Sequence, residues 1–334
     1  MSQLPSMPMS NPPSSRRGSA LLAVLWVSAA LAAIGFSLAS TVREETDRTS
    51  TSVDGLRAYY LAAGSIYRAA WELLWSLQNS AKPLIPPYAT HADYTFPTGQ
   101  VHVDFIPETA KLNINITPPE ELYRLCVALG IDAARAREIA LAIVDWRAPR
   151  GEGPSFDEFY ATLTPSFRPP HASFQEIEEL LLVKGVTPDI FYGTYVPAAE
   201  PGAGRNLLPR QGLADCLSVY GSRGAVDVNT AAPAVLAAIG IPPDVINVLV
   251  ERRRATPFTP QALAEFVAAY GVNGARLRVG RITMLTIRAT ARMRAADGTL
   301  SDLRRSVAAQ VKYASTPYAA PMQILRWYDT AWSF

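Results

Sequence analysis

An uncharged run from Ser19 to Val42 is the feature that most constrains this chain. Such a run is about 36 Å long as an α-helix, and the hydrocarbon core of a bilayer is about 30 Å thick. The run directly follows Arg16, Arg17 and a glycine, and no proline occurs between Arg16 and Lys82. The sequence therefore predicts a helix that can cross a membrane.

Beyond this run the chain turns polar, but apolar residues continue at spacings of three and four, which is typical of one helix face. The residues concerned are Val53, Leu56, Tyr60, Ala63, Tyr67, Ala70, Trp71, Leu74 and Leu77. We expect one helix from residue 19 to about 80, which begins in a membrane and packs on a soluble domain. The prolines after Lys82 end it.

The charges on either side of the run indicate its orientation. Arg16 and Arg17 precede it, whereas residues 43–47 include three acids. The positive-inside rule places the N-terminus in the cytoplasm and the remaining chain outside it. The alternative is a secretory signal that is cleaved near Ala39. The length of the run and the unbroken helix favour a retained anchor.

Composition excludes several classes of protein. The chain has 334 residues, 49% of them hydrophobic, and a net charge of +2, so no global field would attract nucleic acid. Cys126 and Cys216 stand among apolar residues and are expected to be buried free thiols, although an exported domain would permit a bridge. His91, His102 and His171 lack the spacing of a metal site, and no nucleophile elbow or phosphate loop occurs, so we expect no enzyme.

Two segments repeat the same order of motifs. Residues 111–115 and 225–229 each lead through threonine and proline to an apolar run, a Gly-Ile turn and another helix. Both copies continue to an expected third helix that is led by a phenylalanine, Phe174 or Phe258. Two related helical modules are therefore predicted.

Alternating, strand-like segments lie on both sides of this repeat. They cover residues 101–106, 282–293, 303–313 and 323–328, and an Asp-Gly hairpin turn is expected within residues 295–298. A helical insertion into a small antiparallel sheet, packed on the N-terminal helix, explains this order best. The predicted fold class is α+β.

Paired helices with a glycine turn also suggest a helix-hairpin-helix module that binds DNA phosphates through backbone amides. The second glycine of that motif is replaced by Asp132 in one copy and Pro242 in the other. Aspartate repels phosphate and proline has no N–H to donate. The basic run 252–254 closes a helix, where cations are favoured in any case. We therefore expect no nucleic acid as a partner.

The residues around the start of the helix resemble the class III signal of type IV pilins and pseudopilins. This resemblance implies that a prepilin peptidase cleaves between Gly18 and Ser19, after Arg16 and Arg17, and methylates Ser19. Most of the family has a glutamate five residues into the mature chain, where this sequence has Ala23. An unpaired buried charge is costly, so that glutamate needs a partner from a neighbouring subunit. Ala23 needs none, which suits a subunit at the tip of a filament.

Several further motifs, in the same order, resemble the minor pseudopilin K family of type II secretion systems over residues 16 to 313. They are the segments 113–115, 143–146, 179–186 and 226–231. The resemblance implies a pseudopilin fold with an inserted α-domain of two related SAM-like or helix-hairpin-helix-like modules. It also implies a single-pass protein of a Gram-negative inner membrane, with its C-terminal domain in the periplasm.

The same resemblance implies a function in assembly. The protein would sit at the tip of the periplasmic pseudopilus with the minor pseudopilins I and J, and initiate or cap a filament for the export of folded proteins across the outer membrane. Other pseudopilins, the prepilin peptidase and the inner-membrane secretion platform are further expected partners. The alternatives are a membrane-anchored DNA-binding protein of a competence or type IV pilus system, and a minor pilin of a surface pilus.

Family members usually carry acids after the Asp-Trp pair, and these are associated with calcium. The candidate ligands here are Asp145, Glu152, Asp157 and Glu158. Arg147, Ala148 and Arg150 stand where acids are expected, which weakens the case for a cation that needs six to eight oxygen ligands. The other interpretation of the four acids is helix caps and solvated loop charges.

The predicted organisation is a leader (1–18), a transmembrane helix (19–42), its periplasmic continuation (43–82), the first strands (83–110), a first helical module (111–195), a linker and strand (196–224), a second helical module (225–278) and C-terminal strands with a tail (279–334).

Overall fold

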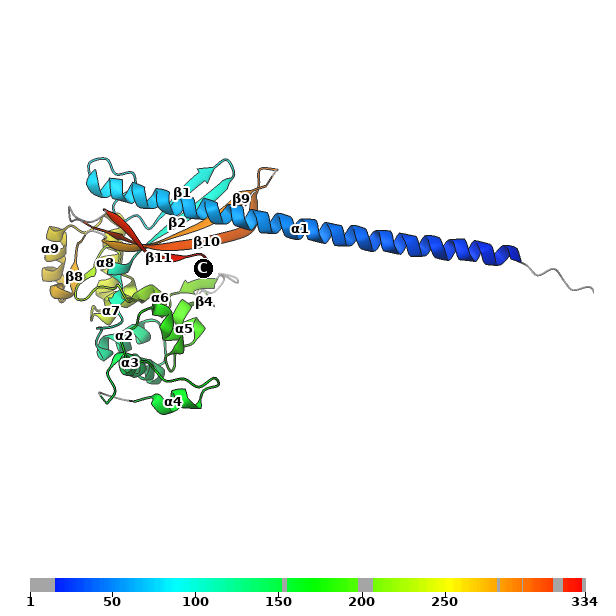
Figure 1. The fold of residues 1–334 in the computed structure, drawn as a ribbon. Helices are drawn as coiled ribbons and strands as arrows, with labels where there is room; N and C mark the ends of the chain where they lie inside the picture. Colours follow the sequence, from blue (N-terminus) through cyan, green and yellow to red (C-terminus); the bar gives the residue numbers. More distant parts are fainter. Residues whose placement is uncertain are drawn as a thin grey trace, which may run out of the picture. The chain divides into compact units, whose positions relative to one another are not determined.

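The computed structural model describes residues 16–151, 155–197, 207–280, 283–295, 297–314 and 321–331. The predicted leader therefore lies outside the described residues, except for its last three positions. The chain divides into two compact units, residues 1–58 and 59–334 (Figure 1). In its described part the first unit consists of helix only, and the second contains the rest of that helix, a sheet and the helical modules.

Helix α1 covers Arg16–Gln78, 63 residues without a break. It is rich in alanine and leucine, which are strong helix formers, and no proline interrupts it. Several hydroxyls in its polar part donate back to the helix backbone, as Thr46 Oγ1 does to the carbonyl oxygen of Val42 at 2.8 Å. The helix ends where the chain approaches Pro83, in agreement with the expected end near residue 80.

One five-stranded antiparallel sheet forms the centre of the second unit, in the order β1-β2-β9-β10-β11. The strands are β1 (His91–Phe96), β2 (Gly99–Pro107), β9 (Met284–Arg294), β10 (Leu300–Tyr313) and β11 (Met322–Tyr328). β2 pairs with β9 although the helical modules separate them in sequence. The predicted α+β fold, a helical insertion into an antiparallel sheet, is confirmed.

Residues 59–78 of α1 pack on one face of this sheet (Figure 1). Ala62, Ile66, Ala69 and Ala70 are fully buried there. The alanines let the helix approach the strands closely, and the Tyr313 hydroxyl of β10 donates to the Ala70 carbonyl oxygen at 2.9 Å.

Gly99, at the start of β2, shows how close this packing is. A Cβ at Gly99 would lie 2.3 Å from the carbonyl oxygen of Arg292 and 3.1 Å from Leu61 of α1. Only a residue without a side chain fits between the helix and the neighbouring strand. This glycine therefore fixes how near the first hairpin lies to α1.

The inserted part lies between β2 and β9 in the sequence. It contains, in chain order, η1 (Glu108–Ala110), β3 (Leu112–Asn113), α2 (Pro119–Ala128), α3 (Ala133–Arg147), α4 (Asp157–Thr162), η2 (Ile177–Leu182), α5 (Pro188–Tyr192), β4 (Thr194–Pro197), β5 (Leu207–Arg210), α6 (Leu213–Cys216), β6 (Leu217–Ser218), β7 (Val226–Asp227), α7 (Pro233–Ala238), α8 (Pro243–Ala255), α9 (Pro260–Tyr270), η3 (Gly274–Arg276) and β8 (Leu277–Arg278). β3 pairs with β6 and β7 with β8, both in parallel.

Both modules share one hydrophobic core, which extends from Leu112 to Leu277. The expected third helix of the second copy is α9, whereas in the first copy it is the 3₁₀ helix η2. Composition suggested a linker before residue 213, yet β4 and β5 form an antiparallel hairpin there. Cys126 and Cys216 are buried and free, and burial raises the pKa of both thiols to about 12.

Candidate functional site

The side of α1 that faces away from the sheet carries large aromatic side chains. Tyr60, Tyr67, Trp71 and Trp75 are 66%, 49%, 57% and 51% exposed. At 100° per residue they fall within one sector of the helix, and we call them the aromatic face. Within it, Tyr67 stacks on Trp327 of β11 with 5.7 Å between ring centroids.

The sequence predicted one apolar stripe packed on the soluble domain, and this was wrong in part. Ala70 and Leu74 are buried, but Tyr60, Tyr67 and Trp71 lie on the exposed side. Apolar residues at spacings of three and four form a broad stripe around a helix, so that one edge of the stripe can touch the sheet while the other edge stays exposed. Mostly small residues fill the side that touches the strands. The other side carries large rings that stay half exposed or more, although Tyr67 among them stacks on Trp327.

Gly64 lies in the middle of the aromatic face. A Cβ there would meet no atom within 4 Å, so the fold does not require a glycine at this position. Glycine inside a helix costs about 1 kcal/mol relative to alanine. The exposed aromatic rings around it leave a notch into which a second helix could pack closely.

The apolar segment of α1 is the membrane candidate. An 18-residue window within Ala20–Gln78 has a mean hydropathy of 2.3, so length and composition suffice for a membrane span, and this is the one such helix among the described residues. Ala23 lies in this segment, and its side chain is exposed in the isolated chain. The backbone at Arg16, Arg17, Gly18 and Ser19 is helical, whereas their side chains lie outside what the structure describes.

The internal repeat is visible in the hydrogen bonds of the modules. Asn115 exchanges two hydrogen bonds with the backbone of Phe174, at 2.7 and 3.0 Å. Asn229 makes the same pair with Phe258, also at 2.7 and 3.0 Å. The asparagine that follows each repeated strand thus joins the start of the module to the phenylalanine that begins its last part.

Arg147 and Arg253 have equivalent structural tasks. The guanidinium of Arg147 donates to the carbonyl oxygens of Ile114 and Thr117, the latter at 2.6 Å. Arg253 donates to those of Val228 and Ala231 at 2.9 and 2.7 Å. Burial lowers the pKa of both arginines. From the sequence, Arg147 was interpreted only as a lost calcium ligand. Its alignment with Arg253 in the repeat was the available signal for this structural role.

The turn that resembles a phosphate-binding hairpin is already capped. Asp132 is the N-cap of α3, and its Oδ2 accepts hydrogen bonds from the amides of Ala134 and Arg135 at 3.1 and 3.2 Å. In the second copy Pro242 takes the N-cap position of α8. The amides that would bind a phosphate in the first copy are therefore engaged by a carboxylate.

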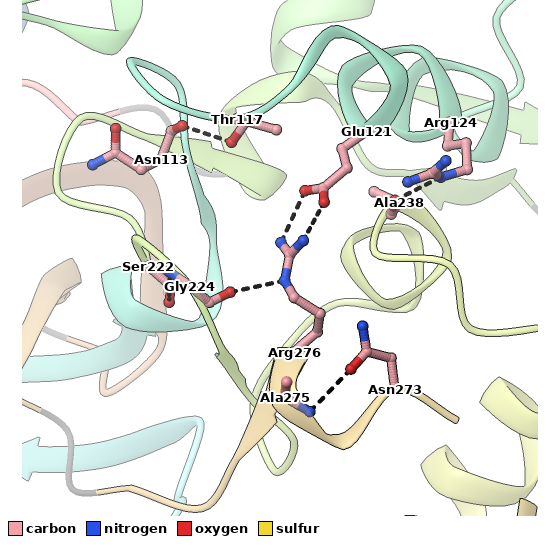
Figure 2. A network of polar contacts seen from close by, with 10 residues as sticks. All are labelled: Asn113, Thr117, Glu121, Arg124, Ser222, Gly224, Ala238, Asn273, Ala275 and Arg276. Carbon is pink, nitrogen blue, oxygen red and sulfur yellow. Dashed lines mark hydrogen bonds and ion pairs between the residues drawn. The ribbon is translucent and has the colours of Figure 1, made fainter. Parts of the chain in front are cut away.

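A partly buried ion pair joins the two modules. Figure 2 shows Arg276, at the end of η3, reaching Glu121 on α2 with Nη1 and Nη2, the two terminal nitrogens of its guanidinium. Nη2 lies 2.9 Å from Oε2, and Nε also donates to the carbonyl oxygen of Gly224 at 3.1 Å. Close by, Arg124 donates to the Ala238 carbonyl oxygen of α7 at 2.8 Å. These contacts fix the first module against the second.

The candidate calcium ligands lie around the loop between α3 and α4. Asp145, in the last turn of α3, accepts a hydrogen bond from the Phe156 amide at 3.1 Å through Oδ2. Asp157, in the first turn of α4, contacts His171 Nε2 through Oδ1 at 2.8 Å. Glu158 is exposed, and Glu152 lies outside the described residues.

The three described candidates, Asp145, Asp157 and Glu158, do not by themselves form a calcium site. The structure brings together Asp145 and Asp157, but an imidazole ring lies between them, and no group of three or more potential ligands exists in the described part of the chain. Calcium requires six to eight oxygen ligands. The spacing of His171 in the sequence did not indicate that the chain folds back there to Asp145.

Comparison with known proteins identifies the first module. Residues 110–193 match the family model described as type II secretion system (T2SS), protein K. The chain is 26% identical, over 197 residues, to type II secretion system protein K of Klebsiella pneumoniae; the match covers 51% of this chain and 58% of that relative. Its fold resembles a chain in the crystal structure of the GspK-GspI-GspJ complex from the enterotoxigenic Escherichia coli type 2 secretion system. The TM-score is 0.55 at 16% identity, covering 86% of this chain and 100% of that chain.

We expect Glu121→Gln to destabilise the protein by about 3 kcal/mol, because it leaves the Arg276 guanidinium without its charged partner between the modules. A change of this size lowers Tm by about 6 °C or more in the full-length protein in detergent. Glu251→Gln is the control, since the Glu251–Arg254 pair is about 70% exposed, and its Tm should change by about 1 °C or less. Equal shifts for both variants would contradict a structural role of the pair between the modules.

Proposed function

Because the chain belongs to the type II secretion system protein K family, we propose that it is a minor pseudopilin that helps to initiate or cap the pseudopilus. The observation that carries the proposal is α1. One unbroken helix joins a segment that can span a membrane to an exposed aromatic face on a folded domain. Neither the apolar segment nor the exposed aromatic face is needed for the folded domain of a single chain, whereas both suit a subunit of a membrane-anchored assembly.

The proposed partners are the minor pseudopilins I and J. The solved structure with a similar fold comes from a complex of GspK with GspI and GspJ. The aromatic face offers large apolar area on one side of a helix, and Gly64 permits close approach of another helix. We propose that helices of I and J pack on this face, and that other pseudopilins and the secretion platform continue the assembly below.

The proposed location is the inner membrane, with the N-terminus in the cytoplasm and the folded domain in the periplasm. Arg16 and Arg17 precede the apolar segment, and acidic residues follow it. The prepilin peptidase would cleave between Gly18 and Ser19 and methylate Ser19. The role we propose is one of assembly, without catalysis by this chain.

Trp71→Glu tests the aromatic face. A charge there should block apolar packing. In detergent, the amount of I and J that co-purifies with the full-length variant should therefore be at least about tenfold lower than with the unaltered protein. Tyr270→Glu, at an exposed tyrosine of α9, is the matched control and should leave the yield unchanged. Normal recovery of I and J with Trp71→Glu would contradict the proposed interface.

Ala23→Glu tests the position at the tip. The variant places a carboxylate in the apolar segment, which then needs a positive partner from a subunit above it. We expect secretion of exoproteins by a strain that carries only this variant to fall several-fold, with the protein still inserted in the membrane. Ala23→Leu is the control. Normal secretion with glutamate at this position would show that Ala23 does not determine tip placement.

A further inference from the structure

A cavity of about 410 Å³ lies between the sheet and the helical insertion. The strands contribute Thr286 of β9, Gln310 of β10 and Tyr328 of β11 to its wall, and η1, η2, α5, α6 and β6 contribute the rest. Side chains alternate along a strand, and Tyr313 of β10 reaches the backbone of α1. Gln310, three residues before it, therefore lies on the opposite face of the sheet, toward the insertion.

Gln310 carries an acceptor that the fold does not use. The residue is 9% exposed, and its Oε1 is buried and accepts no hydrogen bond from any residue that the structure describes. A buried acceptor without a donor is destabilising, and most such atoms in folded proteins have a partner. Because Gln310 lines the cavity, this atom is available to an N–H group of a bound molecule.

Carboxylates surround the same cavity. Glu108 has a side chain that is 4% exposed, and its Oε1 accepts a hydrogen bond from the Thr286 hydroxyl at 2.6 Å. Glu178 and Asp215 are exposed where they line the cavity. Glu176 completes the set of acids.

The cations of the wall do not balance these acids. Each of the three pairs with a carboxylate: Lys111 with Glu108 at 3.7 Å, Arg326 with Glu176, and Arg288 with Asp104 at 3.0 Å. Asp104 is not part of the wall, so its pairing with Arg288 removes one positive charge from the balance. Glu178 and Asp215 form no ion pair with the residues that the structure describes, and they leave the cavity with an excess of negative charge.

Tyr328 responds to this charge. Burial raises its pKa to about 12, and the charges of Glu178, Glu108 and Glu176 act in the same direction, against the opposing effect of Arg326. A negative potential that keeps a proton on this phenol also attracts a bound cation. Tyr328 thus indicates the sign of the potential inside the cavity.

Aromatic rings form a further part of the wall, namely Phe191, Tyr192, Tyr220 and Tyr328. The face of an aromatic ring attracts organic cations, and the rings also offer apolar area to an alkyl chain. A metal ion fits less well, since the described residues contain no group of three or more potential metal ligands. The wall as a whole suits a cation that has both N–H donors and an apolar part.

We propose that this cavity binds an organic cation, an ammonium or a guanidinium group on an alkyl chain, which donates an N–H to Gln310 Oε1 and is balanced by the acids of the wall. A free amine and a basic side chain of another polypeptide have this chemistry in common. The inference does not depend on the proposed function, because none of the residues of the aromatic face lines the cavity.

The test compares two probes on the full-length protein in detergent, at equal ionic strength. N-acetyl-arginine amide carries the guanidinium, and N-acetyl-citrulline amide has nearly the same shape without the charge. For a dissociation constant of about 1 mM, about 20 mM of the arginine compound should raise Tm by about 3 °C, and the citrulline compound should raise it by about 1 °C or less. Equal shifts from both compounds, or no shift from either, would overturn the proposal.

Gln310→Met locates the site. Methionine has a similar length and no strong acceptor, so Tm without a probe should stay the same or rise, whereas the shift with N-acetyl-arginine amide should fall by at least about half. Gln323→Met, at an exposed glutamine of β11 outside the cavity, is the matched control and should keep the full shift. A full shift in Gln310→Met would overturn the proposal.

Glu178→Gln is the second variant, at an exposed position where the substitution does not disturb the core. Should Gln310→Met not fold, this variant decides: a reduced shift supports the cavity as the cation site, and an unchanged shift contradicts it. Agmatine, which carries the same guanidinium without peptide groups, distinguishes the sources. A larger shift with agmatine supports a free amine as the ligand, and a larger shift with N-acetyl-arginine amide supports a side chain of a polypeptide.

Discussion

The close packing of α1 on the sheet is the contact on which the rest of the structure depends. The small side chains of Ala62, Ala69 and Ala70 let the helix lie close to the strands. On the sheet, Gly99 has no side chain that would clash with the helix. This arrangement uses only one side of the helix. The opposite side is left with exposed aromatic rings, and the same helix continues without a break into the membrane candidate. The face of α1 that packs on the sheet and the face proposed for assembly thus lie on different sides of one helix.

The modules depend on a few repeated contacts. An asparagine and an arginine in each copy satisfy backbone groups around the first turn, and a shared core with one ion pair joins the copies. Such contacts fix a helical insertion without long strands. The contacts of His171 are of the same kind, since its ring joins Asp157 at the start of α4 to the carbonyl oxygen of Asp145 at the end of α3.

Much of this could be predicted from the sequence. Long periodic segments, such as α1, β9 and β10, have strong signals, and the repeat indicated both modules. Other features depended on contacts between distant residues. The pairing of β4 with β5 and the return of His171 to Asp145 are tertiary contacts with no local pattern in the sequence. The division of the α1 stripe into two faces was also missed, because spacing alone does not indicate which apolar residues touch the sheet.

The central claim is that the outer face of α1 serves assembly and not folding. Gly64→Leu tests it most directly, with Tm and co-purification of I and J measured on the same full-length protein. Leucine favours the helix, and no atom of the fold stands within 4 Å of the new Cβ, so Tm should stay the same or rise. Recovery of the partners should fall sharply because the notch is filled. Undiminished recovery, or a fall in Tm in parallel with the loss of the partners, would contradict the account.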